Sequence, residues 1–373
     1  MSFFKSISSY LNYLKIKKNN KKKSIYFYSE GKQYRNYFSS IIEELSVSNN
    51  YNIIYFTSDP LDNVKYSNTN SIYIGKGIIR IIFFTTLKCD IMAMTLTDLG
   101  NLEIKKSKKC KYYLYIFHSL MSVFKGYNKN AFNNYDIIFS NGKYQEEEIR
   151  QQEKTYRLNQ KKIINTGYPY IENIKKQIKQ NISDGSILFA PSWLNEQNDL
   201  LEMHGEEIIS KLIEIDKVIF RPHPQSLIKS KNKIEKIQQK FKDNPKFLFN
   251  NNLDKIDILN KSSILITDNG GMAMEYYILY NRPIICIEYK DKIHNMDYKK
   301  IKNKALEDNF KDIFTKKIKV NEINNLKHLI KDYYKNFNFN EKILENFLNE
   351  NGVILDNVAE RSCKSIKDIL KNN

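Results

Sequence analysis

The stretch SILITDNGGMAME, residues 263–275, changes its pattern twice within a few positions. An apolar run typical of a buried strand ends at Asp268, a short turn follows at 269–271, and an apolar helical pattern begins directly after it. Backbone N–H groups at such a turn lack helical partners, and the helix dipole favours a negative charge beside them. The stretch therefore predicts an α/β fold with a phosphate site where this strand meets its helix.

Strand and helix patterns alternate on both sides of this stretch. Strands are expected at residues 25–28, 53–56, 90–95, 112–117, 136–139, 163–166, 187–190, 218–220, 247–249, 264–267 and 284–287, and helices at 34–45, 143–154, 206–215, 341–349 and 354–370. Strands that alternate with helices predict parallel, doubly wound sheets. Because 373 residues exceed one ordinary core, we predict two Rossmann-like domains that face a cleft.

A polar, lysine-rich segment at 172–186 separates the two series of strands and is typical of a linker. The boundary between the two predicted domains is placed inside it. The N-terminal domain is expected to span residues 24–176 and the C-terminal domain residues 177–373. Residues 1–23 are expected to form a separate segment.

That N-terminal segment carries apolar residues at near-helical spacing, including Phe4 and Leu11, followed by a lysine run from Lys15 to Lys23. One interpretation is an interfacial helix with a basic flank, attracted to the anionic inner face of the plasma membrane. The alternative is a helix that packs on its own domain, followed by a solvated linker. The sequence leaves both interpretations open.

The bulk composition narrows the class of partner and the compartment. The formal net charge of +18 favours anionic partners such as nucleotide sugars, phospholipid headgroups or phosphate-rich polymers. No nucleic-acid-binding module is recognisable, so no nucleic-acid partner is expected. The four cysteines have no paired spacing, which predicts reduced thiols in a cytoplasmic protein, and no His/Cys cluster predicts a metal.

Each candidate site residue follows a predicted strand, where ligands bind in open α/β sheets. His118 ends one strand, and an imidazole there can act as a general base toward a hydroxyl or can simply hydrogen-bond in a loop. Arg221-Pro-His-Pro224 ends another strand. Arg221 can fork onto a phosphate, and His223, held between two prolines, can donate to a phosphoryl oxygen. A purely structural loop is the alternative reading of this motif.

Two further strand ends supply candidates. Ser192 can bond a phosphate oxygen, and Trp193, the one tryptophan of the chain, can stack in the site or pack in a core. Asp268 can cap its own turn and fix its shape. Glu275 can accept hydrogen bonds from ribose hydroxyls, or can simply place a negative charge near a helix start.

These residues, taken in order, resemble the CDP-glycerol glycerophosphotransferase family of teichoic-acid and capsule synthesis. The matching pieces are Phe117-His-Ser119, Thr166-Gly-Tyr-Pro169, Phe189-Ala-Pro-Ser-Trp193, Arg221-Pro-His-Pro224, Thr267-Asp-Asn-Gly-Gly-Met-Ala-Met-Glu275, Arg282-Pro283 and Ala359-Glu-Arg361. The family is similar to glycosyltransferases of the two-Rossmann, GT-B type. The resemblance covers roughly residues 110–370.

The resemblance implies a transferase that moves a polyol phosphate from a CDP-polyol to an acceptor hydroxyl and releases CMP, with no bound metal or other cofactor. His118 would be the base on a polysaccharide or lipid-linked acceptor bound by the N-terminal domain. His223 and Arg221 would contact the donor phosphates. The phosphates would also meet Ser192, the turn of Asn269, Gly270 and Gly271, and Arg361, while Asp268 and Glu275 would contact the nucleotide.

Two departures from the family pattern keep other functions open. The family usually has Trp-His-Gly where this chain has Phe117-His-Ser119, and Tyr-Ser-Ser where it has Asn269-Gly-Gly271. A Gly-Gly turn followed by Glu275 is similar to GT-B enzymes that use UDP-sugars, such as the UDP-N-acetylglucosamine 2-epimerase group. The alternatives are therefore a glycosyltransferase that uses a UDP- or CMP-sugar, and a non-catalytic protein that binds anions or membranes.

Overall fold

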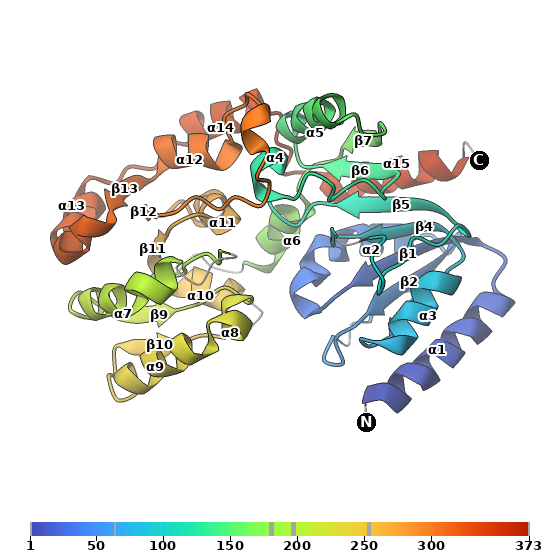
Figure 1. The fold of residues 1–373 in the computed structure, drawn as a ribbon, viewed down its shortest axis with the longest axis horizontal. Coiled ribbons are helices and arrows are strands. Elements are labelled where there is room, and N and C mark those ends of the chain that lie inside the picture. Colours follow the sequence, from blue (N-terminus) through green and yellow to red (C-terminus); the bar gives the residue numbers. More distant parts are fainter. Residues whose placement is uncertain are drawn as a thin grey trace. The chain divides into compact units, whose positions relative to one another are not determined.

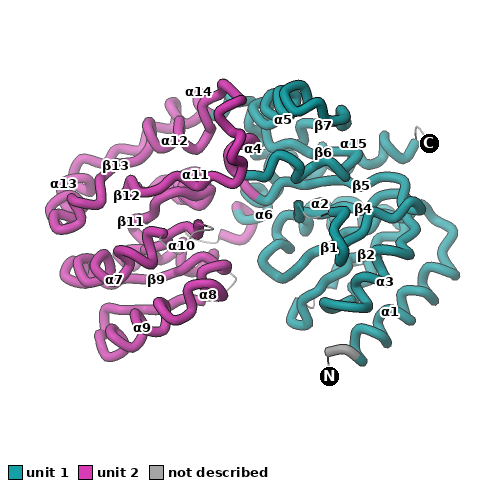
Figure 2. The backbone as a smooth tube through the Cα atoms, in the orientation of Figure 1, with its two compact units in different colours: residues 1–118, 127–174, 348–373 teal, residues 119–126, 175–347 magenta. Residues whose placement is uncertain are grey.

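The computed structural model describes residues 2–62, 65–97, 99–178, 183–194, 199–251 and 255–371, and it divides the chain into two compact units (Figures 1 and 2). Unit 1 comprises Met1–His118, Tyr127–Ile174 and Leu348–Asn373. Unit 2 comprises Ser119–Gly126 and Lys175–Phe347. Each unit is built on its own parallel sheet, as the alternation of patterns predicts.

The sheet of unit 1 has the order β3-β2-β1-β4-β5-β6-β7 among the described residues, and every pairing in it is parallel. Its strands are β1 (Lys23–Ser29), β2 (Tyr51–Thr57), β3 (Thr69–Tyr73), β4 (Cys89–Met94), β5 (Cys110–Ile116), β6 (Ile137–Ser140) and β7 (Lys162–Asn165). The central strands are continuous runs of isoleucine, tyrosine and phenylalanine with buried side chains on both faces. Such runs are expected where helices cover both faces of a parallel sheet.

The helices of unit 1 differ from the prediction at several places. The helix expected at 34–45 is a 3₁₀ helix, η1 (Lys32–Tyr37), followed by α2 (Ser39–Ser46). The other helices of this unit are α1 (Ser2–Asn19), α3 (Ile78–Thr86), α5 (Lys143–Tyr156), α6 (Pro169–Gln177) and α15 (Val358–Lys371). Strand β3 and helix α3 were absent from the prediction: β3 has a mixed polar and apolar sequence, whereas α3 is a largely apolar run whose helical form was missed.

The sheet of unit 2 has the order β10-β9-β8-β11-β12-β13 in the part of the chain that the structure describes, and it too is parallel throughout. Its strands are β8 (Ser186–Phe189), β9 (Val218–Phe220), β10 (Phe247–Phe249), β11 (Ser262–Thr267), β12 (Ile284–Glu288) and β13 (Lys316–Lys319). Its helices are α4 (Val123–Gly126), α7 (Leu200–Ile213), α8 (Ser226–Lys229), α9 (Lys231–Phe241), α10 (Ile256–Lys261), α11 (Gly271–Tyr280), α12 (Leu306–Phe314), α13 (Leu326–Asn336) and α14 (Glu341–Glu350), with 3₁₀ turns η2 (Tyr298–Lys300) and η3 (Val320–Asn325).

The domain boundaries are more interleaved than the prediction of 24–176 and 177–373. The C-terminal helix α15 belongs to unit 1, where its apolar stripe joins the core formed by α2 and the first sheet. Cys363 and Ile366 of this stripe are fully buried there, and Glu172 Oε2 accepts a hydrogen bond from Ala359 N–H at 2.9 Å at the start of the helix. Residues 119–126 conversely belong to unit 2.

The linker predicted at 172–186 is wrong in its first part. Residues 172–177 belong to helix α6, whose Ile171 and Ile174 are fully buried. Lys175, Lys176 and Gln177 are exposed on an otherwise packed amphipathic helix, which explains why this segment resembles a linker in sequence, whereas Asn173 is buried. Residues 179–182 of the predicted linker lie outside the described residues.

Helix α1 packs on unit 1 through one aromatic anchor. Tyr13 is 1% exposed and makes edge-to-face contacts with Tyr26, Phe56 and Phe83. Phe4 and Leu11 nevertheless remain exposed on the same helix. No helix among the described residues is long and apolar enough to span a membrane.

Candidate active site

The predicted donor residues gather at the carboxyl ends of β8, β9 and β11, which are neighbours in the second sheet. The loops after β8 and β11 are bonded to each other. Ser192 N–H donates to Asp268 Oδ1 at 2.7 Å, and Thr267 Oγ1 donates to the Ala190 carbonyl at 2.8 Å. The expectation that Asp268 caps its own turn is wrong, because this buried carboxylate holds the neighbouring loop instead. Its predicted contact with the nucleotide stays a prediction.

The N-terminus of α11 has the features of an anion site. Gly270 is the residue before the helix, and no side chain accepts a hydrogen bond from the first helical N–H groups. Ser192 Oγ and Asp268 Oδ2 are both buried without a hydrogen-bond partner among the described residues. Buried polar groups are normally paired, so the orphaned Ser192 hydroxyl, which can donate to an anion, indicates a place for a ligand beside the uncapped helix start. Asp268 Oδ2 is acceptor-only and suits an N–H or O–H of a ligand.

The two glycines of the turn keep this helix start open. A Cβ on Gly271 would lie 2.6 Å from Ser119 Oγ, so any side chain there would force Ser119 to move. A Cβ on Gly270 would lie 3.8 Å from Ser192 Cβ, which is ordinary contact distance but would fill the space beside the orphaned hydroxyl. Small size therefore matters at this turn more than backbone conformation.

Asn269 uses its side chain to tie loops together. Its Nδ2 donates to the Lys290 carbonyl, and its Oδ1 accepts from Lys311 Nζ at 2.8 Å. These contacts orient the turn for its backbone N–H groups. The predicted phosphate contact of Asn269 is therefore assigned to its backbone, and it stays a prediction.

Arg221 and His223 follow β9 at the same edge of the sheet. Arg221 is buried and its Nη1 donates to Asn250 Oδ1 at 2.7 Å, which fixes the guanidinium. Gln225 N–H donates to His223 Nδ1 at 3.1 Å, so the neutral imidazole carries its proton on Nε2. The ring stacks on Trp193 with centroids 6.3 Å apart. In this tautomer Nε2–H is a hydrogen-bond donor, and the predicted contact of His223 with a phosphoryl oxygen stays a prediction.

Glu275 lies on α11 and is 3% exposed. Lys255 Nζ lies 2.5 Å from its Oε2, and this pairing compensates the buried carboxylate. A carboxylate is an acceptor-only group, which is the type of group that a ribose hydroxyl can donate to. That contact stays a prediction.

His118 follows β5 in unit 1 and is surrounded by tyrosines. Its Nδ1 lies 3.3 Å from the Tyr115 hydroxyl, and its ring meets Tyr34, Tyr37 and Tyr127 edge to face. Burial raises the pKa of Tyr115 well above its ordinary value, so this phenol stays protonated. In the tautomer whose Nδ1–H donates to the phenol oxygen, Nε2 carries the lone pair of the ring.

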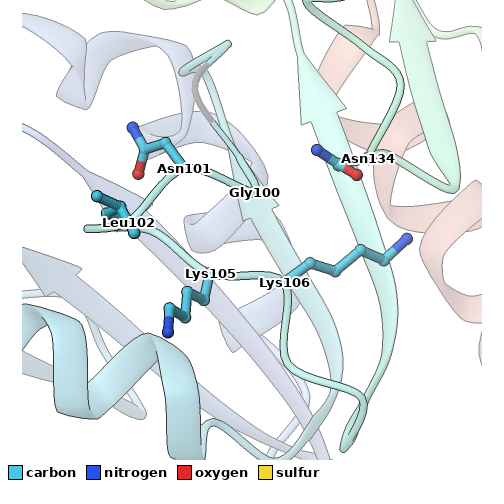
Figure 3. Close-up of a pocket in the computed structure, with 6 residues that line it drawn as sticks. All are labelled: Gly100, Asn101, Leu102, Lys105, Lys106 and Asn134. Atoms are coloured by element: carbon cyan, nitrogen blue, oxygen red, sulfur yellow. The ribbon is translucent and has the colours of Figure 1, made fainter.

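Arg361 is exposed on α15 of unit 1, whereas the other predicted phosphate ligands belong to unit 2. Its predicted approach to the donor phosphates stays a prediction. A pocket of ≈ 590 Å³ in unit 1 is lined by none of the predicted residues but by Gly100, Asn101, Leu102, Lys105, Lys106 and Asn134 (Figure 3).

The loop after β12 was not among the site residues predicted from the sequence. Strand β12 pairs with β11, so the loop after it reaches the same edge of the sheet. This loop carries Lys292 and His294, and the His294 ring lies 6.1 Å from Trp193. The rule that ligands bind at strand ends, applied to the predicted strand 284–287, would have pointed to it.

The fold and this site define a class: two Rossmann-like parallel-sheet domains of GT-B-like type, with an uncapped helix start at a strand–helix junction. A sequence model of the family described as CDP-Glycerol:Poly(glycerophosphate) glycerophosphotransferase matches residues 10–351. The chain belongs to this family, and the protein is a CDP-glycerol glycerophosphotransferase-like transferase. No curated protein sequence matches the chain.

Solved structures confirm the predicted fold class. The wall teichoic acid polymerase TagF matches with a TM-score of 0.61 and 17% identity, covering 99% of this chain and 94% of that chain. A putative UDP-N-acetylglucosamine 2-epimerase from Listeria monocytogenes matches with a TM-score of 0.61 and 15% identity, over 94% and 98% of the two chains. The UDP-GlcNAc 2-epimerase of Methanocaldococcus jannaschii, in complex with UDP-GlcNAc and UDP, gives 0.59 and 15%, over 94% and 100%.

Proposed function

We propose that the protein transfers a polyol phosphate from a CDP-polyol, with CDP-glycerol as the first candidate, to a hydroxyl of a surface polymer or its lipid-linked precursor. The main support for binding of the nucleotide donor is the N-terminus of α11, where the unpartnered Ser192 Oγ lies beside uncapped N–H groups. His223 can add a hydrogen bond there through Nε2–H. Family membership supports the CDP-linked donor. The match to a wall teichoic acid polymerase supports a polymer acceptor.

In the proposed reaction, His118 Nε2 takes the proton of the acceptor hydroxyl as its oxygen attacks the polyol-bearing phosphorus. A new O–P bond forms, the bond from that phosphorus to the bridging oxygen breaks, and CMP leaves with the electron pair. His223 Nε2–H donates to a phosphoryl oxygen as charge builds on it, and Arg221 and the backbone N–H groups of α11 neutralise the phosphates. Among the described residues no His, Cys, Asp or Glu cluster could hold a metal ion, and we assign the neutralisation of charge to these protein groups.

A glycosyltransferase that uses a UDP- or CMP-sugar is the second candidate function. One observation favours it: the turn 269–271 lacks hydroxyl side chains, and Glu275 follows it on α11. The epimerases with the same fold are named for UDP-linked substrates. In that reaction the attack would occur at an anomeric carbon, and the nucleotide phosphates would be the leaving group.

The first prediction separates these functions by their leaving groups. The protein is incubated with CDP-glycerol, CDP-ribitol, UDP-N-acetylglucosamine or a CMP-sugar together with a polyol-phosphate acceptor, and released nucleotides are separated by chromatography. We expect CMP from a CDP-polyol, because the chain belongs to the CDP-glycerol glycerophosphotransferase family. Release of UDP, or of CMP from the CMP-sugar alone, would establish the second function. No turnover and no thermal stabilisation by any nucleotide would indicate a non-catalytic binding protein.

We also propose that α1 contacts an anionic membrane surface. Phe4 is 76% exposed and Leu11 53%, and both lie on a helix that carries Lys5, Lys15 and Lys18. Apolar side chains flanked by lysines are the surface that binds anionic lipid. The proposal places the protein on the cytoplasmic side with its polymer acceptor and without a nucleic-acid partner.

The second prediction tests this surface without removing α1, since Tyr13 anchors the helix in the core of unit 1. We expect the double substitution Phe4→Ser and Leu11→Ser to abolish co-sedimentation with phosphatidylglycerol vesicles. The control Leu102→Ser removes a similarly exposed apolar side chain elsewhere in unit 1 and should change nothing. Equal binding by the double variant and the wild type would refute the membrane contact.

A further inference from the structure

The loop that follows β12, residues 289–295, lies at the same edge of the second sheet as the candidate site but has no role in the proposed function. Strand β12 is hydrogen-bonded to β11 in parallel, so both strands end on the same side of the second sheet. The loop after β11 holds the open start of α11, and Asn269 of that loop donates to the carbonyl of Lys290. The two loops are therefore directly connected.

This loop is pinned in place by the segment 119–126 of the same unit. His294 N–H donates to the Lys125 carbonyl at 3.0 Å, and the buried Asn295 donates through Nδ2 to the Phe124 carbonyl at 2.9 Å. Lys125 Nζ pairs with Asp308 at 2.7 Å and with Asp291 at 3.2 Å. Contacts at both ends of a short loop restrict the positions that its side chains can take.

The rings of His294 and His223 both contact the indole of Trp193. The ring centroids of His294 and Trp193 are 6.1 Å apart with planes inclined by 31°, and His223 lies 6.3 Å from the same indole at 22°. Lys229 Nζ lies 4.5 Å from the centroid of this indole. Two imidazoles from two different strand ends thus meet one aromatic ring beside the orphaned Ser192 hydroxyl.

Lys292 is the second cationic group of the loop. It forms no ion pair within the part of the chain that the structure describes, although the carboxylates of Asp268 and Glu307 act on it electrostatically. Burial is the main effect and lowers the pKa of Lys292. Burial, followed by the charge of Lys292, lowers the pKa of His294 below its ordinary value. An anion bound beside this pair would reverse both shifts.

We propose that Lys292 and His294 form a second phosphate-binding arm of the donor site, which grips the diphosphate together with Arg221, His223 and the N-terminus of α11. The inference rests on the proposed function, because it takes the nucleotide diphosphate as the ligand. The diphosphate carries two negative charges, and the N-terminus of α11 together with Arg221 neutralises only part of this charge. Lys292 and His294 would supply the remaining positive charge. Each phosphate then has cationic ligands from a different strand end.

The third prediction uses CDP-glycerol as the probe and the single tryptophan as the reporter, because Trp193 lies beside the arm. We expect Lys292→Met and His294→Gln each to weaken CDP-glycerol binding by about tenfold, the scale of a charge-assisted hydrogen bond. Affinity is measured by isothermal titration calorimetry and by fluorescence. The matched controls Lys302→Met and His328→Gln remove the same groups from exposed positions of unit 2 and should bind as the wild type does.

The pH dependence supplies a second readout that loss of folding would not mimic. Phosphate favours protonated His294, whose pKa in the unliganded protein is lowered, so affinity should rise as pH falls from 8 to 6. His294→Gln should flatten this rise, whereas His223, Lys229 and Lys292, which also face the site, remain in that variant. Circular dichroism checks that each variant is folded.

The outcomes separate this inference from the proposed function. Wild-type protein that binds no CDP-glycerol would remove the proposed function and the arm with it. Wild-type protein that binds CDP-glycerol, with both arm variants equal to their controls in affinity and pH slope, would overturn the arm alone. A tenfold loss in either arm variant, with folding preserved, supports it.

Discussion

Replacing His118 with alanine is expected to lower kcat for polyol-phosphate transfer by about 100-fold or more, the usual scale for a lost general base. The structure places this imidazole after β5 with Nδ1 3.3 Å from the Tyr115 hydroxyl, and in the tautomer protonated on Nδ1 we propose that Nε2 accepts the proton of an acceptor hydroxyl. Donor binding should be unchanged, because His118 belongs to unit 1 whereas all the proposed donor ligands except Arg361 belong to unit 2. The measurement is CMP release with saturating CDP-glycerol and acceptor.

A graded variant distinguishes the base from its surroundings. Tyr115→Phe keeps the buried ring but removes the oxygen that orients Nδ1, and we expect a smaller fall in kcat than in His118→Ala. His328→Ala is the control, because that histidine is exposed on α13. Full activity of His118→Ala would remove this residue from the mechanism and require another base in unit 1.

His223→Ala is expected to lower kcat by a similar factor of about 100, for a different reason. In the wild type, Gln225 N–H occupies Nδ1 and leaves the Nε2 proton as the donor to a phosphoryl oxygen. Alanine removes that donor and also the ring that stacks on Trp193. Donor affinity should therefore fall as well, unlike in His118→Ala, and calorimetry with CDP-glycerol measures this difference.

The conservative variant His223→Asn separates hydrogen bonding from general packing. An amide N–H can still donate toward the phosphate, so we expect this variant to recover part of the activity that alanine loses. A fall in donor affinity with unchanged kcat in both variants would make His223 a binding residue only. Unchanged kcat and affinity in both would contradict the assignment of this strand end to the donor site.

Local pattern predicted a large part of this fold because parallel sheets leave a strong signature. Strands β1, β5, β11 and β12 are buried on both faces, and continuous apolar runs ending in polar residues reveal them without knowledge of neighbours. The same patterns located most candidate residues at strand ends. Family membership, read from those motifs, is confirmed by the match over residues 10–351.

What local pattern could not reveal are contacts between residues far apart in the chain. Helix α15 returns to the core of unit 1, and Asp268 bonds Ser192 rather than its own turn. Neither partner is visible in a window of neighbouring residues.

The proposed arm of Lys292 and His294 is a different case: the strand-end rule points to the loop after the predicted strand 284–287, but only the strand order shows that this loop lies beside the one after β11. Apolar periodicity specifies which elements form, because burial of each face is a local requirement. Which loops meet depends on the order in which strands pair, and that order is set by packing across the whole sheet.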